Sequence, residues 1–226
     1  MKALRFMKID YIRTRQQMLF LPVIIFAVSA IMMGSGSGIR GGNVVPAFCY
    51  TIFLVIIFST TPFGTCQRKD AGFLMMLPAS TWDRVFGRFL YGISMMAGAV
   101  VVGVCFVLGY RAAGYVPTSV EVSLCLIGFA IAVLLMTGEY VFFYLFGENQ
   151  SQNLLGIARV VPGMIFFFAS SSLSSEIVEN PAELARVMET VGSRLLLIGW
   201  VCAAASVIVL FAAILFCVRM TERRDY

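Results

Sequence analysis

The sequence has no histidine and few charged residues, and both shortages limit what the protein can do. Without histidine, zinc-protease motifs, histidine-ligated haem and Ser-His-Asp triads are excluded. A phosphate-binding GxxxxGK[ST] loop is also missing, so this chain cannot hold ATP by a P-loop of its own. Only 13% of the 226 residues are charged, compared with about 25% in an ordinary soluble domain. The composition therefore excludes a water-soluble enzyme.

The residues that are present are mostly apolar. Hydrophobic side chains make up 60% of the sequence and the mean hydropathy is +0.90, whereas soluble domains are about 45–50% apolar. A helix needs about 20 apolar residues to cross a bilayer, and six stretches approach that length. They are residues 18–33, 44–66, 89–110, 122–146, 154–173 and 195–218. We therefore expect an all-α, polytopic membrane protein in which residues 1–226 form a single bundle of six transmembrane helices.

Lysine and arginine are unevenly divided between the two sides of these stretches. Twelve of the 17 lie in the N-terminal tail, in the 67–88 loop or at the C-terminus, four lie on the other side, and Arg159 lies within a stretch. Cytoplasmic loops of membrane proteins carry the excess of Lys and Arg. The count therefore predicts that both termini are cytoplasmic.

Two charged residues lie deep within the apolar stretches, Glu139 in the fourth and Arg159 in the fifth. If the connecting turn is centred near Gln150, the two residues reach similar depth in an antiparallel hairpin. In one interpretation they form an ion pair that lowers the cost of insertion and holds two helices together. In the other they line a substrate path or gate. The first interpretation is the simpler one, and both stay open.

The sulfur-containing residues do not indicate a metal site. All six cysteines fall inside or at the end of apolar runs, and none has CxxC spacing, so we expect reduced, buried thiols. The 13 methionines form no regular MxxM repeat, and adaptable packing is the better interpretation. No metal is expected in this chain.

The 67–88 loop has the features of a cytoplasmic helix between the second and third spans. It opens with charged residues and continues with an apolar cluster, residues 73–77. Pro78 ends that cluster, and Ser80 is placed to cap a new helix with Asp83 as its capping-box partner. An apolar cluster on the cytoplasmic side has to be covered, either in the membrane interface or by a partner protein.

Two further segments predict helices on the membrane surface. In residues 1–17, Leu4, Met7 and Tyr11 recur at near-helical spacing among basic residues, which suits an interfacial helix on an anionic leaflet. In the external loop, residues 176–194, Asn180 and Pro181 are typical of a helix start. Apolar residues follow at helical spacing, so we expect a short amphipathic helix there with no chemistry of its own.

Three short motifs add a family resemblance. They are LPAS at residues 77–80, GRFL at residues 87–90 and LFGE at residues 145–148. Together with the basic amphipathic tail, two spans, a cytoplasmic loop and four more spans, they resemble the membrane subunits of type-2 ATP-binding-cassette exporters.

The resemblance implies that the 67–88 loop is a coupling element that docks into a groove on a separate ATPase subunit. The residues assigned to this contact are Phe73, Leu74, Met76, Leu77, Ser80, Trp82 and Arg84. Two such membrane subunits, identical or not, and two ATPases would form the transporter in the bacterial cytoplasmic membrane. ATP and Mg²⁺ would bind the ATPase, so this chain would be no enzyme and would need no cofactor.

Relatives move antimicrobial peptides, small toxins, drugs or lipids, so the expected cargo is amphipathic. The expected partners are the ATPase, the second permease subunit and membrane lipid, without nucleic acid. A membrane enzyme would need clustered acids or a nucleophile beside a base, and the spans offer only Glu139. A non-transporting adaptor or an immunity-type subunit of a membrane complex is the remaining alternative.

Overall fold

A computed structural model of the protein describes residues 3–12, 14–15, 19, 48, 51–52, 56, 59, 80–112, 114, 116–146 and 181–224, with side chains for residues 194–223 only in the last range. All regular secondary structure in these residues is helical, without a strand. This agrees with the all-α class expected from the sequence.

Three long helices carry the described part of the membrane bundle. They are α5 (Thr81–Ala112), α6 (Ser119–Phe146) and α8 (Pro181–Arg224). Each is long and apolar enough to cross a membrane, α8 over Arg194–Arg223. They coincide with the expected third, fourth and sixth spans. The first, second and fifth spans lie wholly or mostly outside the described residues, so the count of six stays a prediction.

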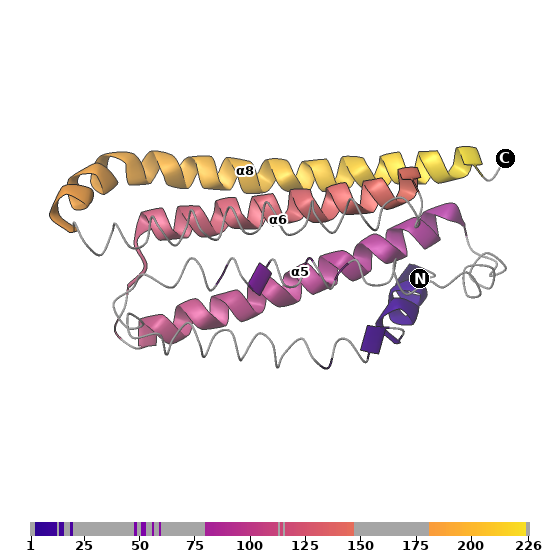
Figure 1. Ribbon diagram of the computed structural model, residues 1–226, viewed down its shortest axis with the longest axis horizontal. Helices are drawn as coiled ribbons and strands as arrows, with labels where there is room; N and C mark the ends of the chain where they lie inside the picture. Colours follow the sequence, from indigo (N-terminus) through magenta and orange to yellow (C-terminus); the bar gives the residue numbers. More distant parts are fainter. Residues whose placement is uncertain are drawn as a thin grey trace.

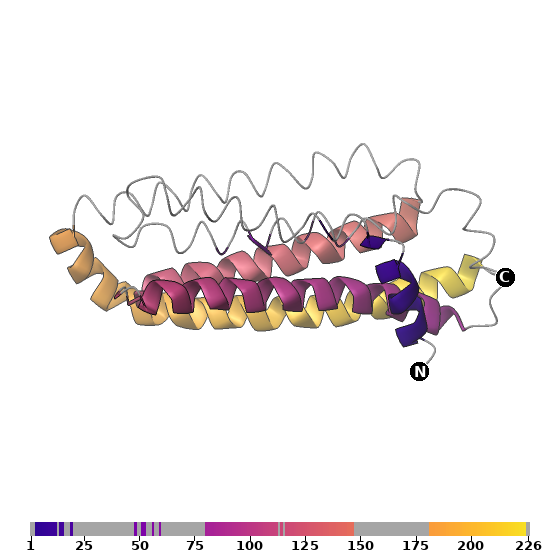
Figure 2. The ribbon, with the colours of Figure 1, turned by 90° about the horizontal axis from the view of Figure 1, so that it is seen from below.

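The three helices lie side by side with one running opposite to the other two. In Figure 1, α6 and α8 run in the same direction along the bundle and α5 runs back against them. The N-terminal helix, described for residues 3–12 and 14–15, lies beside the start of α5 in both ribbon views (Figures 1 and 2). The start of α5 and the last turns of α8 therefore share one end of the bundle with the N-terminal helix, which we call the termini end. The opposite end holds the α5–α6 connection, and we call it the far end.

Contacts between the helices are unevenly distributed. Helix α6 packs most extensively on α8, whereas α5 has the fewest contacts with α6. A Cβ added to Gly199 of α8 would lie 3.3 Å from the Ser123 carbonyl oxygen of α6, so the two backbones approach closely there. Helix α5 meets α6 at Gly92, where a Cβ would lie 2.6 Å from the Tyr140 hydroxyl.

The described residues of the second apolar stretch belong to the core between α5 and α6. They are Phe48, Thr51, Ile52, Ile56 and Ser59, all helical and all buried. Residues 48, 52, 56 and 59 recur at intervals of three or four, which places them on one face of a helix. The ring of Phe48 lies against Gly103 of α5. These described residues therefore belong to the core beside α5 and α6.

The helix expected in the external loop is not separate from the last span. Helix α8 begins at Pro181, as the sequence predicts, but it continues to Arg224 over 44 residues. At about 1.5 Å per residue it is about 66 Å long, roughly twice the thickness of the hydrocarbon core. Figure 2 shows the first turns of α8 bending away from the rest of the helix at the far end.

Candidate functional site at the termini end

The start of α5 is fixed by the cap that the sequence predicts. The backbone N–H of Asp83 donates to Ser80 Oγ over 3.1 Å, and the Ser80 hydroxyl donates to Asp83 Oδ2 over 2.8 Å. The Arg84 N–H reaches the Ser80 carbonyl oxygen at 3.2 Å. The bond from the Asp83 N–H satisfies one of the backbone donors that a helix start leaves open, and the bond from the Arg84 N–H is the first of the helix itself. The two bonds confirm Ser80 as the cap.

An exposed aromatic pair lies on the first turns of α5. The ring of Trp82 stacks on Phe86 with centroids 5.6 Å apart and planes at 14°, and 41% of Trp82 is exposed. With 32 residues, α5 is about 48 Å long, against a hydrocarbon core of about 30 Å. The helix is therefore longer than an untilted crossing needs, and its first turns, before the apolar stretch begins at Phe89, are the more polar end.

Only part of the expected ATPase contact falls in the described residues. Ser80, Trp82 and Arg84 lie on the cap and first turn of α5, where Arg84 is half-buried. The remaining assigned residues lie outside the described residues. They are Phe73, Leu74, Met76 and Leu77. Their place in an ATPase contact stays a prediction.

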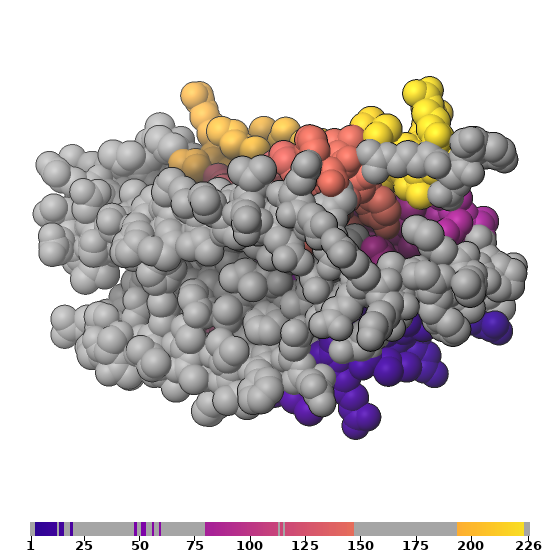
Figure 3. Space-filling view, turned by 45° about the vertical axis from the view of Figure 1, so that its right-hand side comes forward, coloured from indigo at the N-terminus to yellow at the C-terminus, as the bar shows by residue number. Residues whose placement is uncertain are grey.

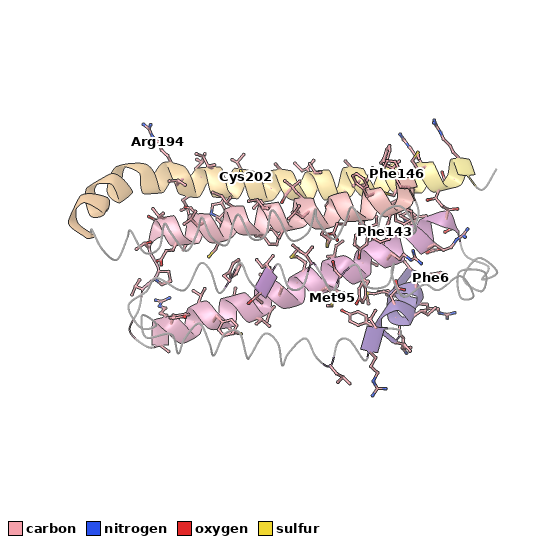
Figure 4. All side chains as sticks on the ribbon, viewed as in Figure 1. Phe6, Met95, Phe143, Phe146, Arg194 and Cys202 are labelled. Carbon is pink, nitrogen blue, oxygen red and sulfur yellow. The ribbon has the colours of Figure 1, made fainter. Side chains whose placement is uncertain are left out.

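The N-terminal helix packs on α5 across a glycine. A Cβ on Gly87 would lie 2.7 Å from both the Ala3 carbonyl oxygen and the Phe6 Cβ. Only a glycine allows the two helices to approach this closely, because any side chain would meet backbone atoms there. Phe6 lies on the N-terminal helix close to α5 in Figure 4. The inner face of this helix also buries Asp10 and Thr14.

Hydroxyl groups join the N-terminal helix to α5 in a defined direction. The Thr14 hydroxyl donates to the Asp10 carbonyl oxygen over 2.8 Å, so it can only accept from the Tyr91 hydroxyl at 3.0 Å. In the same way, Ser94 donates to the Tyr91 carbonyl oxygen over 2.7 Å and accepts from the Tyr11 hydroxyl at 2.8 Å. The rings of Tyr11 and Tyr91 meet edge to face, with centroids 4.9 Å apart. Two tyrosine donors therefore fix the register between the two helices.

The same region continues into α6 and the second apolar stretch. The Tyr140 hydroxyl donates to the Ser59 carbonyl oxygen over 2.9 Å. The ring of Phe89 lies 4.8 Å from that of Tyr140 and stacks on Tyr144 at 6.3 Å. Arg88 hydrogen-bonds to the Tyr144 hydroxyl. The N-terminal helix, the second stretch, α5 and α6 are thus joined at the termini end.

The outer face of the N-terminal helix has the composition of a membrane-surface helix. Leu4 and Ile12 are exposed apolar residues on it, and Arg5, Lys8 and Arg15 are exposed basic residues beside them. The helix lies at the surface of the molecule in the space-filling view (Figure 3). Apolar side chains next to cations suit the boundary between acyl chains and anionic headgroups. Of the three apolar residues that the sequence assigns to this surface, only Leu4 is exposed, because Met7 and Tyr11 pack against the core. The interfacial position of the helix stays a prediction.

Glu139 lies on α6 with its side chain buried. Its expected partner Arg159 lies outside the described residues. Both interpretations of the pair, a structural ion pair or a polar lining of a substrate path, therefore stay predictions.

The hydroxyl network is what sequence reasoning missed. Thr14, Tyr91 and Ser94 carry no local motif, and Tyr91 and Ser94 read as ordinary positions within an apolar stretch. Their partners are 77 and 83 residues away in the sequence. The glycines at residues 87 and 92, near these hydroxyl groups, are the local signal from which a close approach of helices could have been predicted.

The fold and this site are those of a multi-pass helical membrane protein with an exposed aromatic side chain, Trp82, on the first turn of α5. A family model described as "ABC-2 family transporter protein" matches residues 6–222. The chain therefore belongs to the ABC-2 family of transporter proteins, as its motifs suggest, and is an ABC transporter permease. Membership implies partnership with an ATP-binding subunit. No curated protein and no solved structure matches the chain.

Proposed function

We propose that this chain is the membrane-spanning permease subunit of a type-2 exporter, in which a separate ATPase drives the export of an amphipathic substrate. The family assignment supports the permease role and an ATP-binding partner in general. The finer proposal is that residues 67–88 receive that partner on the cytoplasmic side. ATP and Mg²⁺ bind the ATPase, a second permease subunit completes the transporter, and this chain contributes no catalytic residue.

The observation that carries the proposal is the Trp82–Phe86 pair at the start of α5. A large aromatic surface exposed on a rigid helix is the kind of group that anchors protein interfaces. The apolar residues Leu74 and Leu77 precede it in the same loop and need cover on the cytoplasmic side. The two features together favour a docked partner protein over a loop free in water.

The packing of the termini end supports the transmission of force from this loop. A displacement of the first turns of α5 acts directly on the N-terminal helix, because Gly87 holds the two backbones in contact. It also acts on α6 through the contact between Phe89 and Tyr140. Docking and release of the ATPase would thus move several helices at once, and this motion would open and close a substrate path between two permease subunits.

The test uses the only two tryptophans of the chain as a matched pair. Trp82 lies at the termini end and is 41% exposed, whereas Trp200 lies in α8 toward the far end and is 61% exposed. The full chain is co-expressed with each candidate Walker-motif ATPase of its host, and copurification and ATPase stimulation are measured. Trp82→Ala should weaken association by about 2 kcal/mol, roughly thirtyfold in Kd, whereas Trp200→Ala should leave it unchanged.

A stronger variant tests the whole loop. The double change Leu74→Asp, Leu77→Asp should abolish association with the ATPase while the protein stays in the membrane fraction. Undiminished association in this double variant and in Trp82→Ala would reject the coupling role of residues 67–88. Failure of the wild-type chain to bind or stimulate any ATPase would favour the adaptor alternative.

A further inference from the structure

A cavity of about 370 Å³ lies between α5, α6 and α8 toward the far end of the bundle. It is lined by Val104 and Leu108 of α5, Val122 and Phe129 of α6, Trp200 of α8 and Phe48 of the second stretch, among others. Those of α5, α6 and α8 lie within the helices long and apolar enough to cross a membrane. The cavity is separate from the docking region at the termini end.

The cavity exists because α5 and α6 separate from each other toward the far end. The two helices meet at Gly92 and Tyr140 and diverge from there toward the α5–α6 connection, as Figure 1 shows. The ring of Phe48 lies against Gly103 and closes the inner end of the space. The gap is thus built into the angle between two helices and does not depend on one small side chain.

Among the described residues that line the cavity, Glu121 is the only charged one. Its carboxylate accepts from the Thr118 N–H at 2.8 Å and from the Thr118 hydroxyl at 3.1 Å. Glu121 therefore caps the start of α6. An apolar cavity of this kind does not hold water. If it is empty, the side chains that line it lose the van der Waals contacts that an occupant would provide, which lowers stability.

The opening and the length of the cavity fit one hydrocarbon chain. Val104, Leu108 and Trp200 are exposed at its rim, on surfaces that face lipid when the helices span a membrane. The lining runs from Val100 to Leu108 along α5, about 12 Å, and one leaflet of the hydrocarbon core is about 15 Å deep. Trp200 has the amphipathic ring typical of residues near the headgroup level.

We propose that this cavity binds one acyl chain of a membrane phospholipid, taken from the leaflet at the far end. With the predicted topology this is the outer leaflet. The headgroup stays at the membrane surface near the α5–α6 connection, and the chain lies between α5 and α6 with its end toward Phe48. The proposal goes beyond the permease function and does not depend on it.

The test measures contact between a lipid chain and the cavity. The full chain is reconstituted in nanodiscs of phosphatidylethanolamine and phosphatidylglycerol that contain a phospholipid with a diazirine midway along one acyl chain. After illumination, crosslinked peptides are mapped by mass spectrometry. We expect crosslinks concentrated on cavity residues of α5 and α6, and the same pattern when excess unlabelled lipid is added before illumination.

Two valines one turn apart on α5 provide the control. Val104 lines the cavity and is 47% exposed, whereas Val101 is 62% exposed and is not part of the lining. Val104→Trp fills the cavity and should lose most of the cavity crosslinks, whereas Val101→Trp should keep them. Leu108→Trp serves as a second filling variant if Val104→Trp does not fold. Crosslinks spread evenly over exposed faces, or equal in the filled and control variants, would overturn the proposal.

Discussion

Single hydroxyl groups decide how the N-terminal helix sits on α5. The hydroxyls of Thr14 and Ser94 each donate their one proton to a backbone carbonyl of their own helix. Each can therefore only accept a hydrogen bond from the other helix. Tyr91 and Tyr11 supply the two donors. A buried acceptor left without a donor costs more than a hydrogen bond gains. The directions of these bonds therefore disfavour any other register of the two helices.

Removing the Tyr91 hydroxyl should lower stability. Tyr91→Phe leaves Thr14 Oγ1 buried without its donor, which should cost about 1 kcal/mol and lower Tm by about 2–4 °C for a chain of this size. Thermal unfolding of the purified protein in detergent measures the change.

Tyr110 provides the matched control at the other end of the same helix. It is also buried, but its hydroxyl has no hydrogen-bond partner among the described residues. Tyr110→Phe should leave Tm unchanged or raise it. A loss of stability equal to that of Tyr91→Phe would show that the Thr14 contact contributes nothing specific.

At the scale of elements, the N-terminal helix and the start of α5 behave as one packed unit. Their contact depends on Gly87, where the nearest neighbours are a backbone oxygen and a Cβ. Neither neighbour can rotate away, unlike the end of a flexible side chain. A methyl group at this position must therefore push the two helices apart.

Gly87→Ala should separate the N-terminal helix from α5. We expect a loss of about 1–3 kcal/mol from overpacking, with faster proteolysis of the first residues as the local readout. Gly98→Ala is the control, because Gly98 lies in the same helix and a Cβ there would meet nothing within 4 Å. That change should be neutral or stabilising by up to about 1 kcal/mol, since alanine is the better helix former. Equal effects of the two substitutions would contradict the close approach at Gly87.

The helix boundaries could be predicted from the sequence where they depend on residues within one turn of the boundary. Pro78, Ser80 and Asp83 predict the start of α5 to the residue, because capping chemistry acts within one turn. The sequence predicts a boundary at Arg194, between an external loop and the last span, but α8 continues through it. A charged residue does not end a helix, so hydropathy alone places the boundary wrongly. The hydrogen bonds of Tyr91 and Tyr140 could not be predicted from the sequence. Hydrophobic periodicity treats tyrosine as an apolar residue, and it carries no information about a hydrogen-bond partner 77 or 81 residues away.

At the scale of the molecule, the helix directions are consistent with the predicted topology. The start of α5 and the ends of α6 and α8 lie with the N-terminal helix at one end of the bundle (Figure 1). The exposed basic face of that helix, with Arg5 and Lys8, lies at the same end. Positive residues collect on the cytoplasmic side of membrane proteins. The arrangement therefore places both termini together, and the charge count predicts that they face the cytoplasm.

Reporter fusions test this orientation. Green fluorescent protein attached to either end of the full chain should fluoresce, and alkaline phosphatase at either end should be inactive. A fusion inserted at the α5–α6 connection, after Gly114, should give the opposite pattern. An active phosphatase at one terminus would mean that the number of spans is odd or that the chain is inverted.

The crossing of α5 with α6 at Gly92 has a mechanical consequence. Gly92 lies 11 residues from the first residue of α5 and 20 residues from its last, so the helix has arms of about 16 Å and 30 Å on either side. If α5 tilts as a rigid rod about this fulcrum, a shift of the tip that carries Trp82 is magnified about twofold at the opposite tip. In the proposed permease, a small displacement of the first tip by the ATPase would then become a larger sideways movement at the far end of the bundle.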